Sequence, residues 1–203
     1  MKKIICFGDT ITEMGMVTES RGFVPRLAER YTRRADVLGR GFSGYTTREA
    51  LAVLDEAVLR EYPSCVCIAF GLNDSVLPNQ FHHVPLDEYR RNLEDLASRA
   101  ACSGAWIILV GPPPLDERKT NSREMRLTAQ YANACEDAGD EMNLPVINLF
   151  QLIQDHDHWE TKCLLDGIYL SASGMDILYE ALVRELDQQF PLSTLPLLGM
   201  EQI

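Results

Sequence analysis

The sequence predicts a three-layer α/β fold built on a parallel sheet. Short apolar or β-branched runs alternate with longer segments of helical period, and the connections between them are short. A strand, a helix and a second strand joined in this way cross over in a right-handed sense and pair in parallel. With 203 residues the chain can bury one substantial core, so we expect residues 1–190 to form one domain, followed by a tail at 191–203.

Five short runs are the predicted strands, because each is apolar or β-branched and is bounded by turn residues. They cover residues 3–7, 36–38, 65–70, 106–110 and 146–149. Five longer segments are the predicted helices, at residues 23–31, 47–61, 86–101, 122–142 and 173–189. In the last of these, Met175, Leu178, Leu182 and Leu186 recur at helical spacing, and Pro191 marks the end. The apolar tail after it is expected either to pack back on the body or to dock a partner.

Composition excludes several classes of function. The 30 acidic and 19 basic side chains give a net charge of −11, and no basic patch is evident, so we expect no nucleic-acid partner. No apolar run approaches the ~20 residues of a membrane span. The six cysteines lack the paired spacing of metal ligands. We expect them to be small, buried, apolar side chains of a protein in a reducing compartment. We therefore expect an intracellular protein, in the cytoplasm or an organelle.

Four polar turns are the candidate site, because ligands of open parallel sheets bind at the carboxyl ends of the strands. The turns are Gly-Asp-Thr-Ile-Thr at 8–12, Gly-Phe-Ser-Gly-Tyr-Thr-Thr at 41–47, Gly-Leu-Asn-Asp at 71–74 and Asp-Gly-Ile-Tyr-Leu-Ser at 166–171. Each alone is ordinary turn or helix-cap composition. Their order and spacing are more specific than any single turn.

Taken together, the four turns resemble the blocks of the SGNH/GDSL hydrolase family, which has Gly-Asp-Ser, a Gly, Gly-x-Asn-Asp and Asp-x-x-His in this order. The resemblance covers nearly the whole chain. Segments 40–45, 111–114 and 159–171 also look like the isoamyl acetate-hydrolysing esterase subgroup. The resemblance implies a flavodoxin-like fold with a five-stranded parallel sheet, a small acyl ester or carboxylate as ligand, and neither a metal nor an organic cofactor.

The resemblance assigns a role to several residues. Gly44 and Asn73 match the oxyanion-hole positions, together with the backbone N–H of Thr10. Each well-placed donor of this kind stabilises a tetrahedral oxyanion by about 3 to 4 kcal/mol. Asp166 matches the acid that orients the catalytic histidine.

Two positions depart from the family. Thr10 stands where the family has its serine nucleophile, and Tyr169 stands where it has its histidine base. Threonine keeps a hydroxyl but adds a crowding methyl group. A tyrosine side chain is phenolate in only about one molecule in a thousand at pH 7, so it is a poor general base there. We expect Tyr169 to donate a hydrogen bond to Asp166, and the chain to be an esterase-like scaffold with impaired catalysis that acts as a binding or structural component, for example within a protein assembly.

Other interpretations stay open on the sequence alone. An active hydrolase of short acyl esters could use Thr10 as nucleophile and His82 or His83 as base. Ser43 is a displaced nucleophile in principle, without an evident base. The two departures could also be substitutions introduced to trap a ligand, for which threonine is an unusual choice.

Two further patterns are discounted. Residues 39–44 fit the G-x-G-x-x-G dinucleotide fingerprint, but they follow the second strand and lack the acidic partner that ribose recognition requires. His156 and His158 lie in a polar run that fits a surface turn better than a metal site, because further ligands cannot be placed.

Overall fold

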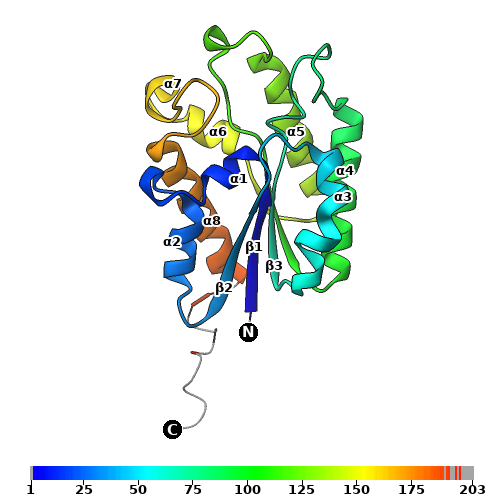
Figure 1. Ribbon diagram of the computed structural model, residues 1–203, viewed down its shortest axis with the longest axis vertical. Helices are drawn as coiled ribbons and strands as arrows, with labels where there is room; N and C mark the ends of the chain where they lie inside the picture. Colours follow the sequence, from blue (N-terminus) through cyan, green and yellow to red (C-terminus); the bar gives the residue numbers. More distant parts are fainter. Residues whose placement is uncertain (1, 190, 193–194, 196, 198–203) are drawn as a thin grey trace.

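The computed structural model describes residues 2–189, 191–192, 195 and 197 (Figure 1). Its centre is a five-stranded sheet of order β2-β1-β3-β4-β5 in which every pair is parallel. The strands are β1 (Lys2–Gly8), β2 (Ala35–Gly41), β3 (Cys65–Ala69), β4 (Trp106–Val110) and β5 (Val146–Ile147). The predicted fold class is confirmed.

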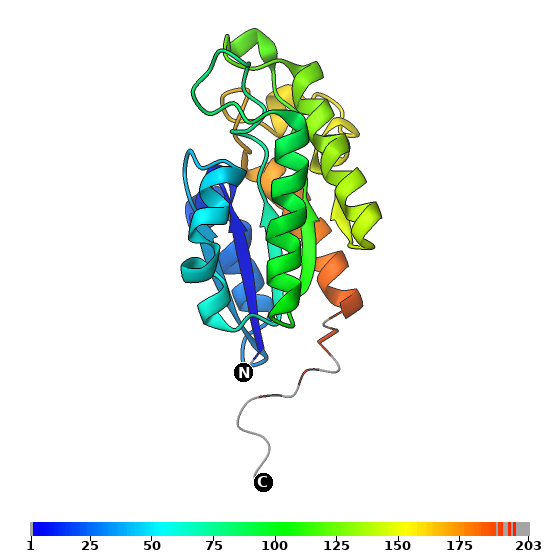
Figure 2. The same cartoon turned by 90° about the vertical axis from the view of Figure 1, so that its right-hand side faces the viewer.

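Helices cover both faces of the sheet, as Figures 1 and 2 show from two sides. One face carries α1 (Thr10–Met14), α2 (Phe23–Arg30), α6 (Leu149–Gln154) and α8 (Ala172–Gln189). The other carries α3 (Thr47–Ala57), α4 (Leu86–Cys102) and α5 (Met125–Met142). The remaining short elements are α7 (Trp159–Lys162) and three 3₁₀ turns, η1 (Thr18–Ser20), η2 (Leu59–Glu61) and η3 (Glu117–Lys119).

The core is divided by the sheet into two apolar layers. In β1, Ile4 and Cys6 belong to the layer under α2 and α8, whereas Ile5 and Phe7 belong to the layer under α3, α4 and α5. This alternation follows from the period of two in a strand, and burial on both faces explains why the run is apolar throughout.

The predicted element boundaries differ from the structure where local hydrogen bonds compete with the periodic pattern. The predicted helix at 122–142 begins at Met125, because the Ser122 carbonyl accepts from Leu77 N–H at 2.9 Å and Arg123 pairs with Val76 in an antiparallel bridge. The strand predicted at 146–149 ends at Ile147, since the next residue caps α6. The helix predicted at 47–61 ends at Ala57 and is followed by η2.

The described part of the tail contacts the body. Leu192 packs against the core layer under α2 and α8, Leu195 is buried, and the Arg34 guanidinium donates hydrogen bonds to both of their carbonyls. The rest of the predicted tail at 191–203 lies outside the described residues.

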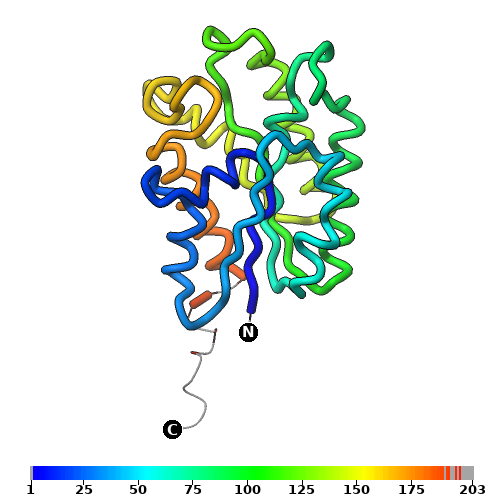
Figure 3. The backbone as a smooth tube through the Cα atoms, in the orientation of Figure 1, coloured from blue at the N-terminus to red at the C-terminus, as the bar shows by residue number. Residues whose placement is uncertain are grey.

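The loops that leave the carboxyl ends of the strands gather at the end of the molecule opposite the start of β1, the upper end of the tube in Figure 3. Within the part of the chain that the structure describes, no helix has the length and apolar character needed to cross a bilayer.

Candidate active site

Thr10 lies at the junction of β1 and α1. Asp9 caps α1, its Oδ1 accepting the Ile11 N–H at 2.9 Å, and Thr10 is the first residue of the helix. The first N–H groups of a helix have no intrahelical acceptor. Among the described residues the Thr10 N–H has no hydrogen-bond acceptor, as an oxyanion donor requires. Thr10 is 8% exposed.

The loop after β2 covers the Thr10 hydroxyl. The Gly44 N–H donates to Thr10 Oγ1 at 3.1 Å, and Ser43 Oγ lies 3.3 Å from the same oxygen. Gly44 adopts φ +79°, a left-handed conformation that favours glycine. Glu13 on α1 holds the loop from the other side, because its Oε2 accepts the Ser43 N–H at 2.9 Å.

Asn73 comes from the loop after β3 and is 5% exposed. Its Nδ2 donates to the Tyr45 carbonyl at 2.9 Å, which ties the third turn to the second. A side-chain amide has two N–H donors, so this contact leaves one for a ligand. The Gly44 N–H thus contacts Thr10 directly, and Asn73 reaches the same loop through the Tyr45 carbonyl. The structure therefore brings together three of the predicted residues, Thr10, Gly44 and Asn73. We call these three residues the cradle.

Arg123 supports the cradle from behind. Its guanidinium donates to Asn73 Oδ1 at 3.3 Å and to the Leu72 carbonyl. The residue is 8% exposed, and burial lowers the pKa of Arg123 although Tyr169 and Asp9 lie within electrostatic range and oppose the effect. The sequence does not single out Arg123 as a site residue, because it falls inside the helix predicted at residues 122–142.

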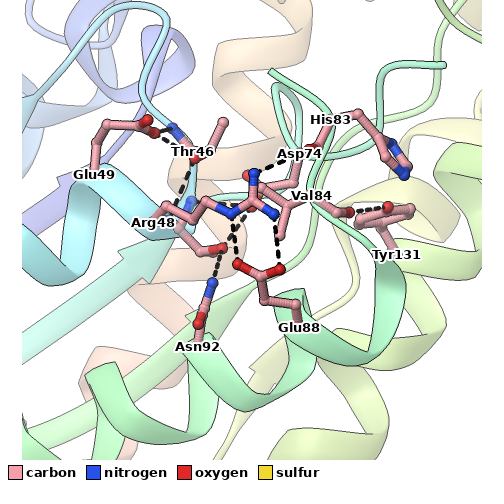
Figure 4. Close-up of polar contacts among 10 residues, drawn as sticks. Thr46, Arg48, Glu49, Asp74, His83, Val84, Glu88, Asn92 and Tyr131 are labelled. Carbon is pink, nitrogen blue, oxygen red and sulfur yellow. Dashed lines mark hydrogen bonds and ion pairs between the residues drawn. The ribbon is translucent and has the colours of Figure 1, made fainter. Parts of the chain in front are cut away.

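Asp74, next to Asn73, is the centre of a buried polar network (Figure 4). Its Oδ1 accepts from the Thr47 N–H at 2.9 Å and from the Thr47 hydroxyl at 2.6 Å, and Asn92 donates to that hydroxyl at 2.9 Å. Nearby, Arg48 on α3 makes two hydrogen bonds to Glu88 on α4. Burial raises the pKa of Asp74 to about 6, against the hydrogen bonds from Thr47.

Asp9 is a second buried carboxyl group beneath the cradle, 2% exposed. Burial raises the pKa of Asp9 to about 7, opposed first by the hydrogen bond from Ile11; nearby Asp74 raises it further and Arg123 lowers it. Below that pH the Asp9 carboxyl group is largely protonated, and it then carries little negative charge to compensate the positive charge of Arg123.

The turn at residues 166–169, which we call the Asp166 turn, combines local contacts with a backbone hydrogen bond from the distant Asp116 N–H to the Gly167 carbonyl at 2.7 Å. Asp166 is exposed, and its Oδ1 accepts the Ile168 and Tyr169 N–H groups, each at 3.0 Å. The predicted hydrogen bond from the Tyr169 phenol to Asp166 is wrong, because the donor is the Tyr169 backbone. Within the described residues the Tyr169 hydroxyl makes no hydrogen bond, and its ring packs partly buried against the core layer under α2 and α8.

No histidine contacts the Thr10 hydroxyl in the described part of the chain, which includes all four. His83 Nδ1 lies 2.7 Å from the Val76 carbonyl, and the His82 ring packs edge-on against Phe81 with centroids 5.2 Å apart. His156 and His158 are exposed. Among the described residues, no three His, Cys, Asp or Glu side chains come together in an arrangement that could hold a metal ion.

Hydrogen-bond donors that converge at the carboxyl end of a parallel sheet, around a buried hydroxyl, define the scaffold of an acyl-transfer hydrolase. Residues 6–177 match the GDSL-like lipase/acylhydrolase family. The chain therefore belongs to the GDSL/SGNH hydrolase family.

Relatives of known name agree with this assignment. The chain is 35% identical to a mouse isoamyl acetate-hydrolysing esterase 1 homologue, covering 96% of this chain and 84% of the relative. It is 34% identical to a GDSL esterase/lipase of Arabidopsis thaliana, covering 93% and 87%. Among solved structures, a lipase/acylhydrolase from Enterococcus faecalis superposes with a TM-score of 0.81 at 26% identity, covering 93% of this chain and 97% of that one. An acetylxylan esterase from Geobacillus stearothermophilus, with a TM-score of 0.75 at 24% identity over 91% and 94% of the two chains, shares the fold.

Proposed function

We propose that this protein binds a small acyl ester or carboxylate in the cradle and hydrolyses it poorly, acting as a binding or structural component. The observation that supports the proposal is the environment of the Thr10 hydroxyl. Its hydrogen-bond partners among the described residues are the Gly44 N–H and the Ser43 hydroxyl, and neither is a base at neutral pH. The ligand class follows from the family and from relatives named for ester hydrolysis.

The expected loss of rate is large. Nucleophilic attack by a hydroxyl needs a general base that takes its proton. In serine hydrolases, removal of the nucleophile or the base costs on the order of 10⁶ in turnover, and roughly 10³ to 10⁴ over water remains from the oxyanion hole and from binding. The cradle by itself therefore favours ligand binding over efficient turnover.

The first experiment compares the wild-type protein with Thr10→Ala on p-nitrophenyl acetate and p-nitrophenyl butyrate. We expect the two rates to agree within experimental error. Wild-type turnover far above that of Thr10→Ala would overturn the proposal. In that case, a variant with alanine at both His82 and His83 tests whether one of these histidines is the base. Loss of the rate in this variant, together with an inflection in the wild-type pH–rate profile near the ordinary histidine pKa of ~6.5, would show that one of them is.

The second experiment restores the family residues. The double variant Thr10→Ser with Tyr169→His returns a serine and an imidazole to the two departing positions, beside unchanged Gly44, Asn73 and Asp166. We expect ester hydrolysis to rise by roughly 10³-fold or more over the wild type, whereas each single variant gains much less, because nucleophile and base act as a unit. A double variant as slow as the wild type would contradict the proposal that the rest of the site is competent.

The six cysteines also bear on where the protein works. All six are free, and five of them are buried. Unbridged thiols suit a reducing compartment, which supports our proposal of an intracellular protein.

A further inference from the structure

The strongest unassigned feature of the molecule is the buried guanidinium of Arg123. The residue lies in the extended segment just before α5, held there by the bridge to Val76, and its side chain reaches the loop after β3. A buried charge is costly unless it is hydrogen-bonded or paired. The described residues offer Arg123 two carbonyl-type acceptors, Leu72 O and Asn73 Oδ1, and no salt bridge.

The Asn73 amide has a chemically distinct group on each side. Its Oδ1 faces the Arg123 guanidinium at 3.3 Å, and its Nδ2 faces the Tyr45 carbonyl at 2.9 Å. A guanidinium only donates hydrogen bonds and a carbonyl only accepts them. Rotating the amide by 180° would therefore place donor against donor at Arg123 and acceptor against acceptor at Tyr45. Arg123 and Tyr45 together allow a single orientation.

This orientation is the one the cradle requires. An oxyanion is stabilised by N–H donors held in place before the charge develops, and an amide oxygen in the same place would repel it. Without Arg123, the Tyr45 carbonyl alone would hold the amide, and the Leu72 carbonyl that precedes Asn73 would lose its charged donor as well.

We infer that Arg123 is a positioning residue, which locks the Asn73 amide with its N–H donors toward Tyr45 and the ligand. The orientation of the amide follows from the contacts alone. Its consequence for ligand stabilisation rests on the proposed function of the cradle. The two parts are tested separately.

The orientation is tested by NMR on the ¹⁵N-labelled wild-type protein, without any ligand. The side-chain amide signals of Asn73 are identified by their absence from Asn73→Ala. We expect solvent exchange of this NH₂ group to be about fivefold faster in Arg123→Met, since the loss of one supporting hydrogen bond worth about 1 kcal/mol corresponds to about that factor. Arg126→Met is the matched control, because Arg126 lies three residues further on, is exposed, and should leave the Asn73 signals unchanged.

The consequence is tested by a double-mutant cycle in the Thr10→Ser, Tyr169→His background. We expect Asn73→Ala to lower kcat for p-nitrophenyl acetate by about 10²- to 10³-fold, and Arg123→Met by about 10-fold or more with KM little changed. On top of Asn73→Ala, Arg123→Met should cost almost nothing, because its target is gone. Arg123→Lys keeps the charge but not the planar fork, so it should recover only part of the rate.

Distinct results would overturn each part. Unchanged Asn73 exchange in a folded Arg123→Met protein rejects the positioning role, and if that variant does not fold, Arg123→Lys carries the same measurement. Equal losses from Arg123→Met with and without Asn73 would show that Arg123 acts elsewhere. An inactive background variant would count against the proposed function, while the NMR result would still decide the orientation of the amide.

Discussion

The cradle and the Asp166 turn, which the sequence predicts as parts of one site, are held in different ways. The cradle and its supporting residue Arg123 are joined by hydrogen bonds among segments far apart in the sequence, and the side chains of Thr10, Asn73 and Arg123 are buried. The Asp166 carboxylate is exposed, and it accepts hydrogen bonds from backbone N–H groups within three residues of Asp166, although the Asp116 N–H also donates to the Gly167 carbonyl of this turn at 2.7 Å. The side chains of the cradle thus depend on partners from distant segments, whereas the Asp166 carboxylate depends on the backbone of its own turn.

The comparison predicts which of the two groups of residues tolerates substitution. A donor group in the cradle cannot be replaced without disturbing neighbours that share its hydrogen bonds, as with Asn73 between Tyr45 and Arg123. The side chain at 169 has no such partners, since its hydroxyl is not hydrogen-bonded within the described residues. We therefore expect substitutions at this position to leave the hydrogen bonds of the cradle intact.

The largest expected effect is that of substituting Asp166 in the variant that carries a serine at position 10 and a histidine at position 169. In the Thr10→Ser, Tyr169→His background, Asp166→Asn should lower kcat by roughly 10³- to 10⁴-fold, because the imidazole loses the carboxylate that orients it. In the wild-type background the same substitution should leave ligand binding unchanged. Steady-state kinetics and titration with butyrate give the two readouts. Equal rates for the restored enzyme with and without the Asp166→Asn substitution would contradict the assignment.

The second effect concerns the carboxyl group beneath the cradle. Asp9 has a folded pKa of about 7, above the ordinary value of 3.8, so the folded state keeps the proton more tightly than the unfolded state. The stabilisation that comes from this tighter proton binding is therefore fully present below about pH 4. As the pH rises from there to about 7, the free energy of unfolding falls by about 1.4 kcal/mol per pH unit. Urea unfolding of the wild type and Asp9→Asn across this range measures the difference in slope.

The slope is the decisive quantity in that experiment. Asparagine keeps an acceptor for the Ile11 N–H, and any other change in hydrogen bonding shifts stability equally at every pH. Asp95→Asn, at an exposed position on α4, is the matched control and should follow the wild-type curve. A wild-type and an Asp9→Asn curve that run parallel from pH 4 to pH 7 would exclude a raised pKa at Asp9.

A smaller effect separates backbone strain from function. Gly44 and Gly104 have φ values of +79° and +87°, and a Cβ atom at either would meet nothing within 4 Å. Alanine should therefore cost about 1 to 2 kcal/mol of stability at each position, from the left-handed conformation alone. Of the two, Gly44→Ala alone should also lower the rate of the restored enzyme, because alanine disfavours the left-handed conformation that aims the residue 44 N–H into the cradle. Urea unfolding measures the loss of stability in each variant, and steady-state kinetics measures the rate. Equal losses of rate in the two variants would contradict a specific role of Gly44 in the cradle.

Much of the cradle was predictable because each member lies in a short motif directly after a strand. The parallel sheet brings the ends of β1, β2 and β3 together, so Thr10, Gly44 and Asn73 needed no long-range information beyond the strand order. Arg123 was not predictable in this way. It lies in a loop far along the chain, and its burial depends on an antiparallel bridge to Val76 that a helical period conceals.

The shortest elements were missed for a related reason. α1, α6 and α7 have 5, 6 and 4 residues, too few for a helical repeat to be recognised. The polar turn predicted after β1 is in fact the start of α1, capped by Asp9, and this places the Thr10 N–H at a helix start. Capping contacts of this kind depend on side-chain geometry that the sequence alone does not fix.

The smallest expected effect tests whether Tyr169 has any role through its hydroxyl. Tyr169→Phe removes an oxygen that is not hydrogen-bonded in the described structure, so stability should change by no more than about 0.5 kcal/mol. Tyr131→Phe is the matched comparison, because the buried Tyr131 hydroxyl donates to the Val84 carbonyl, and its loss should cost about 1 to 3 kcal/mol. Urea unfolding compares the two, and butyrate titration should give wild-type affinity for Tyr169→Phe. A weaker affinity would show that the phenol contacts the ligand, and the Asp166 turn would then belong to the binding site.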